Sequence, residues 1–266
     1  MTEIRTRREP PPFRTVEVVR VEPRSPHMVR ITLAGPEFEG FDPGLPAASV
    51  RLFLPGCLHG SLPGGSTGVV LPTWRGNEFL LEDGSRPIIR TLTPLRFEPG
   101  RLELDVEVVT HGHGPLSAWA DAAEPGDRVA GSGTGRGYEI DPAARAFLLA
   151  GDESALPAIS ALLEALQPDA EVQVLVEVRG AAARLELPAH PGATVQWHQS
   201  RAGSRPGDSI VAALTGARLD PDLRLWAAGE AASMQRIRRH LFEDRGLPRS
   251  CAVVRGYWKH GRDGGS

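Results

Sequence analysis

The sequence predicts two domains of different fold class, an N-terminal antiparallel β-barrel followed by an α/β domain with a parallel sheet. The first observation is a hydrophobic pattern with a period of two before about residue 142. The second is an alternation of strand-like runs with helical patterns after that point. The third is length, because 266 residues are enough for two domains of ordinary size. We therefore expect domains at residues 1–142 and 143–266.

The first half consists of short strands with one buried face. In residues 101–109, RLELDVEVV, the leucines and valines share one face while Glu103, Asp105 and Glu107 share the other. This alternation is typical of an antiparallel strand with one face on a core. Similar runs occupy residues 15–21, 28–35, 49–56 and 87–93. Glycine and proline separate these runs, which favours a closed barrel or a sandwich.

The second half alternates strands and helices. Its strand-like runs are residues 146–150, 171–178, 194–198 and 223–229. Apolar residues recur at helical spacing over 155–166, and Met234, Ile237 and Leu241 share one face of the last helix, which Gly246 can cap. Such alternation predicts a parallel sheet covered by helices.

Composition and charge exclude several classes of function. A net charge of −3 gives no basic surplus for nucleic acid or an anionic membrane surface. No apolar run approaches the ~18 residues of a membrane span, and no export signal is visible. The two cysteines, Cys57 and Cys251, match no metal-binding spacing. We expect a cytoplasmic protein without a nucleic-acid partner, a membrane insertion or a metal site.

The stretch RPIIRTLTPLRF, residues 86–97, brings a cation and a hydroxyl onto one strand. Arg90 and Thr93 are three residues apart in it. An arginine can grip a phosphate, and a hydroxyl can hydrogen-bond a ring nitrogen. A surface arginine on an ordinary strand is the alternative.

The stretch VVTHGHGPLSAWADAAEPGD, residues 108–127, predicts an anion-binding turn. A strand ends at Thr110, glycines follow, and a short helix is expected over 117–123. Residues 114–117 therefore offer backbone N–H groups and a hydroxyl at a helix start, an arrangement that binds anions. An ordinary capped turn is the alternative. The two histidines of His111-Gly-His113 lack a carboxylate or cysteine partner for a metal.

A third turn, GDES at residues 151–154, carries carboxylates where a nucleotide-binding turn would hold phosphate. At a helix N-terminus, Asp152 and Glu153 complement the helix dipole, and an Asp or Ser cap satisfies unpaired N–H groups. We therefore expect this turn to exclude the standard Gly-x-Gly-x-x-Gly mode of binding.

Taken in order, five blocks make the chain resemble the siderophore-interacting protein family, a branch of the ferredoxin-reductase-like flavoproteins. The blocks are HGHGPLSAWA, EPGD, LLAGDESALPAI, WAAGE followed by RIRRHL, and GYWKHG, and the matches run from about residue 15 to residue 261. The resemblance implies an FAD-binding barrel followed by an NAD(P)H-binding α/β domain. It also implies that the 151–154 turn faces the nicotinamide end of the site.

The resemblance implies roles for individual residues. Arg90 would meet the flavin phosphate, and Thr93 would approach the isoalloxazine ring near N5. The turn at 114–117 would hold the pyrophosphate, which favours FAD over FMN. The cofactor-binding residues implied are Arg90, Thr91, Leu92, Thr93, His111, Gly114, Pro115, Leu116, Ser117, Asp152, Glu153, Ala155, Gly229 and Glu230. Gly229 and Glu230 match the position near the nicotinamide.

Two positions depart from the family pattern. Leu92 stands where an aromatic residue usually stacks on the flavin, and Leu95 stands where an arginine often follows, although Arg96 is adjacent. Stacking contributes about 0.5–1.5 kcal/mol beyond burial. These departures predict weaker flavin affinity rather than loss of binding.

The activity that the resemblance implies is flavin-dependent reduction of a ferric siderophore by NAD(P)H. Hard oxygen donors hold Fe(III) more tightly than Fe(II), so one electron releases the metal. No acid–base residue is required. Because ferric siderophores are often anionic, we expect a basic rim formed by Arg51, Arg136 and Lys259.

Several alternatives remain open. Reduced ferredoxin could replace the nicotinamide as donor, and the protein could be a flavin reductase with another acceptor, a choice that the glycine-rich segment 55–76 could set. It could also be a non-catalytic ferric-siderophore-binding protein. Arg179, Arg201 and Arg205 could each meet the 2′-phosphate of NADPH, and no spacing selects one of them.

Overall fold

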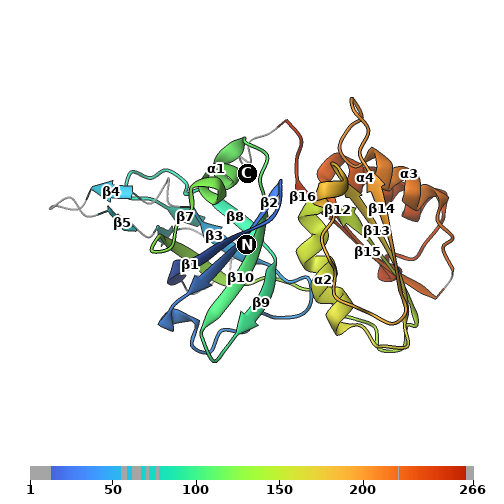
Figure 1. Ribbon diagram of the computed structural model, residues 1–266, viewed down its shortest axis with the longest axis horizontal. Helices are drawn as coiled ribbons and strands as arrows, with labels where there is room; N and C mark the ends of the chain where they lie inside the picture. The colour runs from blue at the N-terminus through green and yellow to red at the C-terminus, as the bar shows by residue number, and fades with distance from the viewer. Residues whose placement is uncertain are drawn as a thin grey trace, which may run out of the picture.

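The computed structural model describes residues 13–54, 59–61, 67–69, 72–75, 78–220 and 222–261. Two sheets of different kind lie side by side, an antiparallel one from the first half of the chain and a parallel one from the second (Figure 1). The predicted change of fold class is thereby confirmed. Residues 135–145, which join the two sheets, contain no helix or strand.

The first sheet is antiparallel throughout and closes on itself. Its order is β8-β3-β11-β1-β2-β10-β9. The strands are β1 (Phe13–Ser25), β2 (Met28–Ala34), β3 (Val50–Phe53), β8 (Ile89–Leu92), β9 (Pro94–Glu98), β10 (Glu103–Val109) and β11 (Arg128–Thr134). The two edge strands, β8 and β9, are separated in the chain by Thr93 alone, so the edges of the sheet must meet there. This seam gives the sheet the form of a barrel, as expected.

Two short hairpins and one helix accompany the strands of the barrel. Two short hairpins lie between β3 and β8, formed by β4 (His59–Ser61) with β5 (Thr67–Val69) and by β6 (Thr73–Arg75) with β7 (Glu78–Leu80). Of the segment 55–76, the structure describes only residues 59–61, 67–69 and 72–75, so its predicted role in acceptor choice lies largely outside the described residues. Helix α1 (Gly114–Ala122) follows β10 and begins three residues before the predicted start.

The second sheet is parallel, in the order β14-β13-β12-β15-β16. Its strands are β12 (Ala146–Asp152), β13 (Glu171–Val178), β14 (Ala193–Gln199), β15 (Leu223–Glu230) and β16 (Ala252–Trp258). Helix α2 (Leu156–Ala165) covers one face, and α3 (Asp208–Gly216) and α4 (Ala231–Arg239) cover the other. Strand β16 is missing from the sequence expectation because Arg255 and Gly256 interrupt its apolar pattern.

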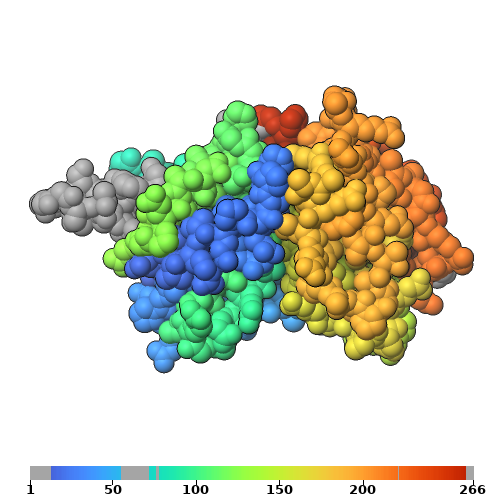
Figure 2. Space-filling view, viewed as in Figure 1, coloured from blue at the N-terminus to red at the C-terminus, as the bar shows by residue number. Residues whose placement is uncertain are grey.

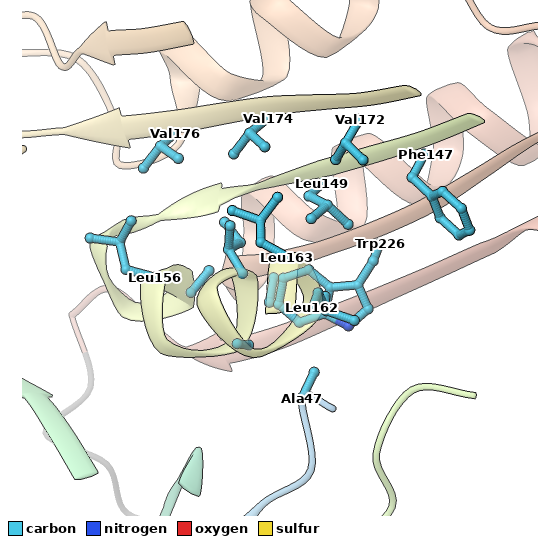
Figure 3. Close-up of a cluster of buried hydrophobic side chains, with 14 of the residues drawn as sticks. Ala47, Phe147, Leu149, Leu156, Leu162, Leu163, Val172, Val174, Val176 and Trp226 are labelled. Atoms are coloured by element: carbon cyan, nitrogen blue, oxygen red, sulfur yellow. The ribbon is translucent and has the colours of Figure 1, made fainter. Parts of the chain in front are cut away.

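The core of the parallel sheet extends into the barrel half. Leu149 and Val174 pack with Leu162 of α2 and with Trp226, and Ala47 from the barrel half belongs to the same cluster (Figure 3). Figure 2 shows the two halves in contact along their shared boundary. The two halves therefore share an apolar cluster, to which Met28 and Val109 of the barrel half also contribute.

Among the helices of the described ranges, none is long and apolar enough to cross a bilayer.

Candidate functional site

The barrel seam at Thr93 is where the two halves meet through polar groups. Thr93 is 7% exposed, and it lies close enough to Tyr257 of β16 to act on the pKa of the phenol, which burial raises and the Thr93 hydroxyl partly lowers. One strand earlier in the barrel, Arg51 of β3 lies directly opposite Thr91 of β8. The motif predicted to hold a flavin thus lies against the C-terminal end of the parallel sheet.

The side chains of the other residues in the 90–93 motif have different surroundings. Arg90 is half-buried, and its Nη1 donates to the carbonyl of Ile89 at 2.9 Å. Thr91 is exposed, whereas Leu92 packs against the barrel core. Leu92 therefore contributes to barrel packing. Further along, Leu95 and Arg96 line a groove between β9, residues 43–47 and α2, and Arg96 pairs with Glu98 at 3.6 Å.

The turn before α1 is open and uncapped. Gly114, the first residue of α1, has φ +77°, and the N-cap residue His113 makes no capping hydrogen bond with its side chain. The first turn contains Pro115 and no acidic residue. No heavy atom lies within 4 Å of the point where a Cβ on Gly112 would stand. Free N–H groups, an open backbone and no carboxylate in the first turn fit a diphosphate.

Ser117 supports this turn from inside. It is 1% exposed, and its Oγ accepts hydrogen bonds from the backbone N–H groups of His111 at 3.0 Å and Gly112 at 3.1 Å while donating to Asp121 at 3.3 Å. The hydroxyl therefore shapes the loop, and the expected contact of residues 114–117 with a phosphate stays a prediction. Leu116 packs against the barrel core, and the ring of His111 is exposed.

The turn before α2 is closed by Asp152. Its Oδ1 accepts from the Ser154 N–H at 2.9 Å and from the Ser154 hydroxyl, and its Oδ2 accepts from the Glu230 N–H at 3.0 Å and from Trp258 Nε1 at 2.8 Å. Burial raises the pKa of Asp152, although these hydrogen bonds act in the opposite direction. The predicted cap is confirmed, and the same carboxylate joins the ends of three strands.

Glu153 and Ala155 face inward. Glu153 is 5% exposed; its Oε1 accepts from the Arg179 N–H at 2.7 Å, and its Oε2 lies 3.5 Å from the Arg179 guanidinium. Arg179 also donates to the carbonyl of Thr110 at 3.4 Å, at the end of β10. Ala155 is fully buried in the core. Both side chains are buried, and the expected cofactor contacts of Glu153 and Ala155 stay predictions.

Gly229 and Glu230 form the end of β15. Gly229 has φ +156°, and a Cβ there would stand 2.6 Å from Oδ2 of Asp152. Glu230 is 4% exposed; its carboxylate accepts from the Ser233 N–H at 2.9 Å, which caps α4, and from the His260 N–H at 3.3 Å. The buried carboxylate of Glu230 therefore joins the start of α4 to the C-terminal segment.

The three predicted basic residues are all exposed. Arg51 lies between Thr91 of β8 and Ser132 of β11. The backbone carbonyl of Arg136 accepts a hydrogen bond from Arg255 at 3.1 Å. Lys259 directly follows β16. The backbone positions of Arg136 and Lys259 are therefore both tied to β16.

Sequence reasoning missed Arg255, a residue of β16. The Arg255 guanidinium donates to the carbonyls of Ala47 at 3.2 Å, Arg136 at 3.1 Å and Gly137 at 2.9 Å, all in the barrel half. Its alternation with Val253 and Tyr257 was the available signal, since it places all three on one face of a strand. Among the described residues, no group of three or more His, Cys, Asp or Glu side chains could hold a metal ion.

Comparison with known proteins identifies the family of this chain. The family profile described as siderophore-interacting FAD-binding domain matches residues 17–136, and that described as siderophore-interacting protein matches residues 144–261. A protein of Mycobacterium tuberculosis is 35% identical over 94% of this chain and 92% of its own length. The ferric vibriobactin reductase of Vibrio cholerae is 27% identical over 94% of this chain and 90% of its own length.

Comparison with solved structures gives the same family. A siderophore utilization protein from T. fusca is 34% identical, covers 96% of this chain and 95% of its own, and superposes with a TM-score of 0.80. The siderophore-interacting protein of Aeromonas hydrophila is 30% identical, with 94% and 99% coverage and a TM-score of 0.72. Phthalate dioxygenase reductase, at 13% identity and a TM-score of 0.60, shares the fold, with 93% of this chain and 68% of its own covered. The chain belongs to the siderophore-interacting protein family, with a ferredoxin-reductase-like fold and a family FAD-binding domain in its first half.

Proposed function

We propose that the protein is a flavin-dependent ferric-siderophore reductase, which passes electrons from NAD(P)H through FAD to Fe(III) and releases Fe(II). The observation that carries the proposal is the convergence at Thr93. There the flavin motif of the barrel lies beside Tyr257, at the end of the sheet that would receive the nicotinamide. The likeness to the ferric vibriobactin reductase of Vibrio cholerae supports the choice of acceptor.

The barrel offers a donor set suited to FAD. The uncapped N–H groups from Gly114 onward would hold the diphosphate, and Arg90 would supply the positive charge. Thr93 would hydrogen-bond the ring, and Ser117 would keep the loop in shape from behind. When bound, FAD accepts two electrons as hydride and passes them on singly.

The strand ends of the parallel sheet would position the electron donor. The backbone between Gly229 and Glu230 is held by Asp152, whose Oδ2 accepts from the Glu230 N–H. Of the arginines considered for a 2′-phosphate, Arg179 is occupied by Glu153 and the carbonyl of Thr110. This leaves Arg201 and Arg205, both exposed in the loop after β14, as the candidates for NADPH recognition.

The substrate would approach the exposed cations Arg51, Arg136 and Lys259. A ferric siderophore with net negative charge is attracted by such a rim, and its iron need not touch a protein ligand. Charge reversal at Arg51 therefore raises the KM for an anionic ferric chelate and leaves the KM for a neutral one unchanged. Arg218→Glu is the matched control, because Arg218 is an 88% exposed surface arginine paired only with Asp220 among the described residues. An equal KM in R51E and wild type removes Arg51 from the site.

The experiment that tests the proposal is a visible spectrum of the purified protein before and after incubation with FAD. Bound flavin should show its usual absorption bands and lose them anaerobically with NADH or NADPH. Addition of a ferric siderophore and a ferrous chelator should then restore the bands and colour the chelator. Bleaching without iron reduction favours a reductase with another acceptor. A protein that remains colourless but binds the ferric siderophore is a non-catalytic binding protein.

A further inference from the structure

Arg255 joins two segments of the barrel half to the parallel sheet. It belongs to β16, the edge strand of that sheet, which lies next to the barrel half (Figure 1). Its Nη1 donates to the carbonyls of Ala47 at 3.2 Å and Arg136 at 3.1 Å, and its Nη2 donates to the carbonyl of Gly137 at 2.9 Å. One side chain therefore holds the chain before β3 and the chain after β11 at the same point.

These two segments of the barrel half lie back to back. The N–H of Tyr138 donates to the carbonyl of Pro46 at 2.7 Å. A Cβ on Gly137 would stand 2.7 Å from the carbonyl oxygen of Leu45, so the backbones leave no room for a side chain there. Ala47 is buried with a φ of 54°, a left-handed conformation that persists only where its surroundings hold it. The three carbonyls therefore form a preformed site for the guanidinium.

The three predicted rim cations, Arg51, Arg136 and Lys259, lie on the segments that Arg255 connects. Arg51 is in β3, shortly after Ala47. The backbone of Arg136 supplies one of the three carbonyls, and Lys259 directly follows the strand that contains Arg255. The positions of the rim cations relative to one another therefore depend on one guanidinium.

The charge of Arg255 is not offset by a carboxylate. Within the described ranges, neither Arg255 nor any of the rim cations forms an ion pair with Asp or Glu. A guanidinium stays protonated, and carbonyl dipoles carry no net charge to cancel it. Arg255 is also half-buried, where solvent and salt screen a charge less than at the surface. Its charge therefore adds to the positive field of the rim.

We propose that Arg255 is a positioning residue for the substrate site, which holds the rim cations in one arrangement across the contact of the two halves and thereby makes the site selective for ferric chelates of net negative charge. The inference rests on the proposed function, since it takes the rim cations to face the substrate. It adds that selectivity by charge is set from the parallel-sheet half, by a side chain that need not touch the chelate.

The test is an equilibrium titration of the full chain, with FAD present, by two gallium(III) chelates. Ga(III) resists reduction, so the titration measures binding alone. A tris-catecholate complex carries a net negative charge, and a tris-hydroxamate complex is neutral. Arg255→Lys keeps the charge but replaces the planar fork of donors by a single ammonium, which cannot reach three carbonyls in the same way. We expect the Kd of the anionic complex to rise about tenfold and that of the neutral complex to change less than twofold.

A chain without the rim cations separates positioning from a change in the fold. With all three replaced by glutamine, R255K should add less than twofold to the Kd of the anionic complex. Arg238→Lys is the matched control, because Arg238 also donates to a carbonyl of β16, that of Val254, but from α4 within the same half. It should leave both Kd values unchanged.

The inference is overturned if R255K binds the anionic complex as tightly as wild type does, since charge alone would then suffice. It is also overturned by an equal loss for both complexes, or by a full effect of R255K in the chain without the rim cations. Wild type that binds the anionic gallium complex selectively but does not reduce the ferric one would instead overturn the proposed reductase activity, so the two failures are distinguishable.

Discussion

The molecule contains two strand–glycine–helix turns with opposite chemistry. The turn from β10 to α1 is open: its glycines have free space around them, and the helix start carries no acidic residue. The turn from β12 to α2 is closed: Gly151 lies against Ala155 and the carbonyl of Ala228, and Asp152 and Glu153 fill the helix start. The same local geometry leaves a helix start open in one half and closes it at the domain contact in the other.

The difference lies in whether the N–H groups at the helix start are left free, as an anion site requires. In the closed turn the Asp152 carboxylate satisfies them and also ties β15 and β16 together. In the open turn Ser117 organises the loop from behind and leaves the helix start exposed. Substitutions in either turn test this difference.

The largest effect is expected from Gly114→Asp, which places in the open turn the carboxylate of the closed one. We expect the Kd for FAD to rise about 30- to 100-fold, because repulsion at a partly buried helix start is worth about 2–3 kcal/mol. Fluorescence titration with FAD measures it. Gly84→Asp is the control, since Gly84 has a similar φ of +81° and open space but lies outside the turn. An equal Kd in G114D and wild type would contradict a diphosphate site there.

The next largest is Gly151→Ala in the closed turn. A Cβ there would stand 2.4 Å from Ala155 Cβ and 2.5 Å from the Ala228 carbonyl oxygen. We expect the free energy of unfolding, measured in urea, to fall by about 2–3 kcal/mol. Gly112→Ala in the open turn meets no atom within 4 Å and should cost about 1 kcal/mol of left-handed backbone strain. Equal losses in the two variants would remove the contrast in packing.

A smaller loss is expected from Asp152→Asn. The amide replaces one acceptor oxygen by a donor facing other N–H groups, so the free energy of unfolding should fall by about 1–2 kcal/mol at neutral pH. Asp169→Asn, at an exposed pair with Arg145, is the control and should cost almost nothing.

The pH dependence of that loss has a definite sign. Because burial raises the pKa of Asp152 above its value in the unfolded chain, the folded protein binds the proton more tightly. Asp152 therefore favours folding more as pH falls through its raised pKa toward the unfolded value, and this contribution is lost as pH rises again. The stability difference between wild type and D152N should widen on acidification, and a difference that narrows would contradict the assigned direction.

Period-two and strand–helix patterns identified most of both sheets from the sequence. The roles of Arg90, Thr93 and Gly114 came from the family resemblance and stay predictions. The buried roles of Ser117, Glu153 and Ala155 could not be read, because spacing gives no direction to a side chain. Arg255 was missed for the same reason: its partners are carbonyls more than 100 residues away in the chain.

The smallest effect is expected from Arg179→Ala, which cuts the link between the closed turn and the end of β10. Its guanidinium is 40% exposed, so the loss of stability should stay below about 1 kcal/mol. The ratio of kcat/KM for NADPH over NADH should be unchanged within about twofold, because Glu153 already occupies this arginine. A selective loss of NADPH activity would place the 2′-phosphate at Arg179 instead.

The most direct test of the account is a single anaerobic turnover. The FAD-loaded protein is reduced with one equivalent of NAD(P)H, freed of nicotinamide, and mixed with a ferric siderophore and a ferrous chelator. The account predicts that the flavin bands return as about two ferrous ions appear per FAD, because the cofactor holds two electrons. Flavin that stays reduced in the presence of excess ferric siderophore would contradict it.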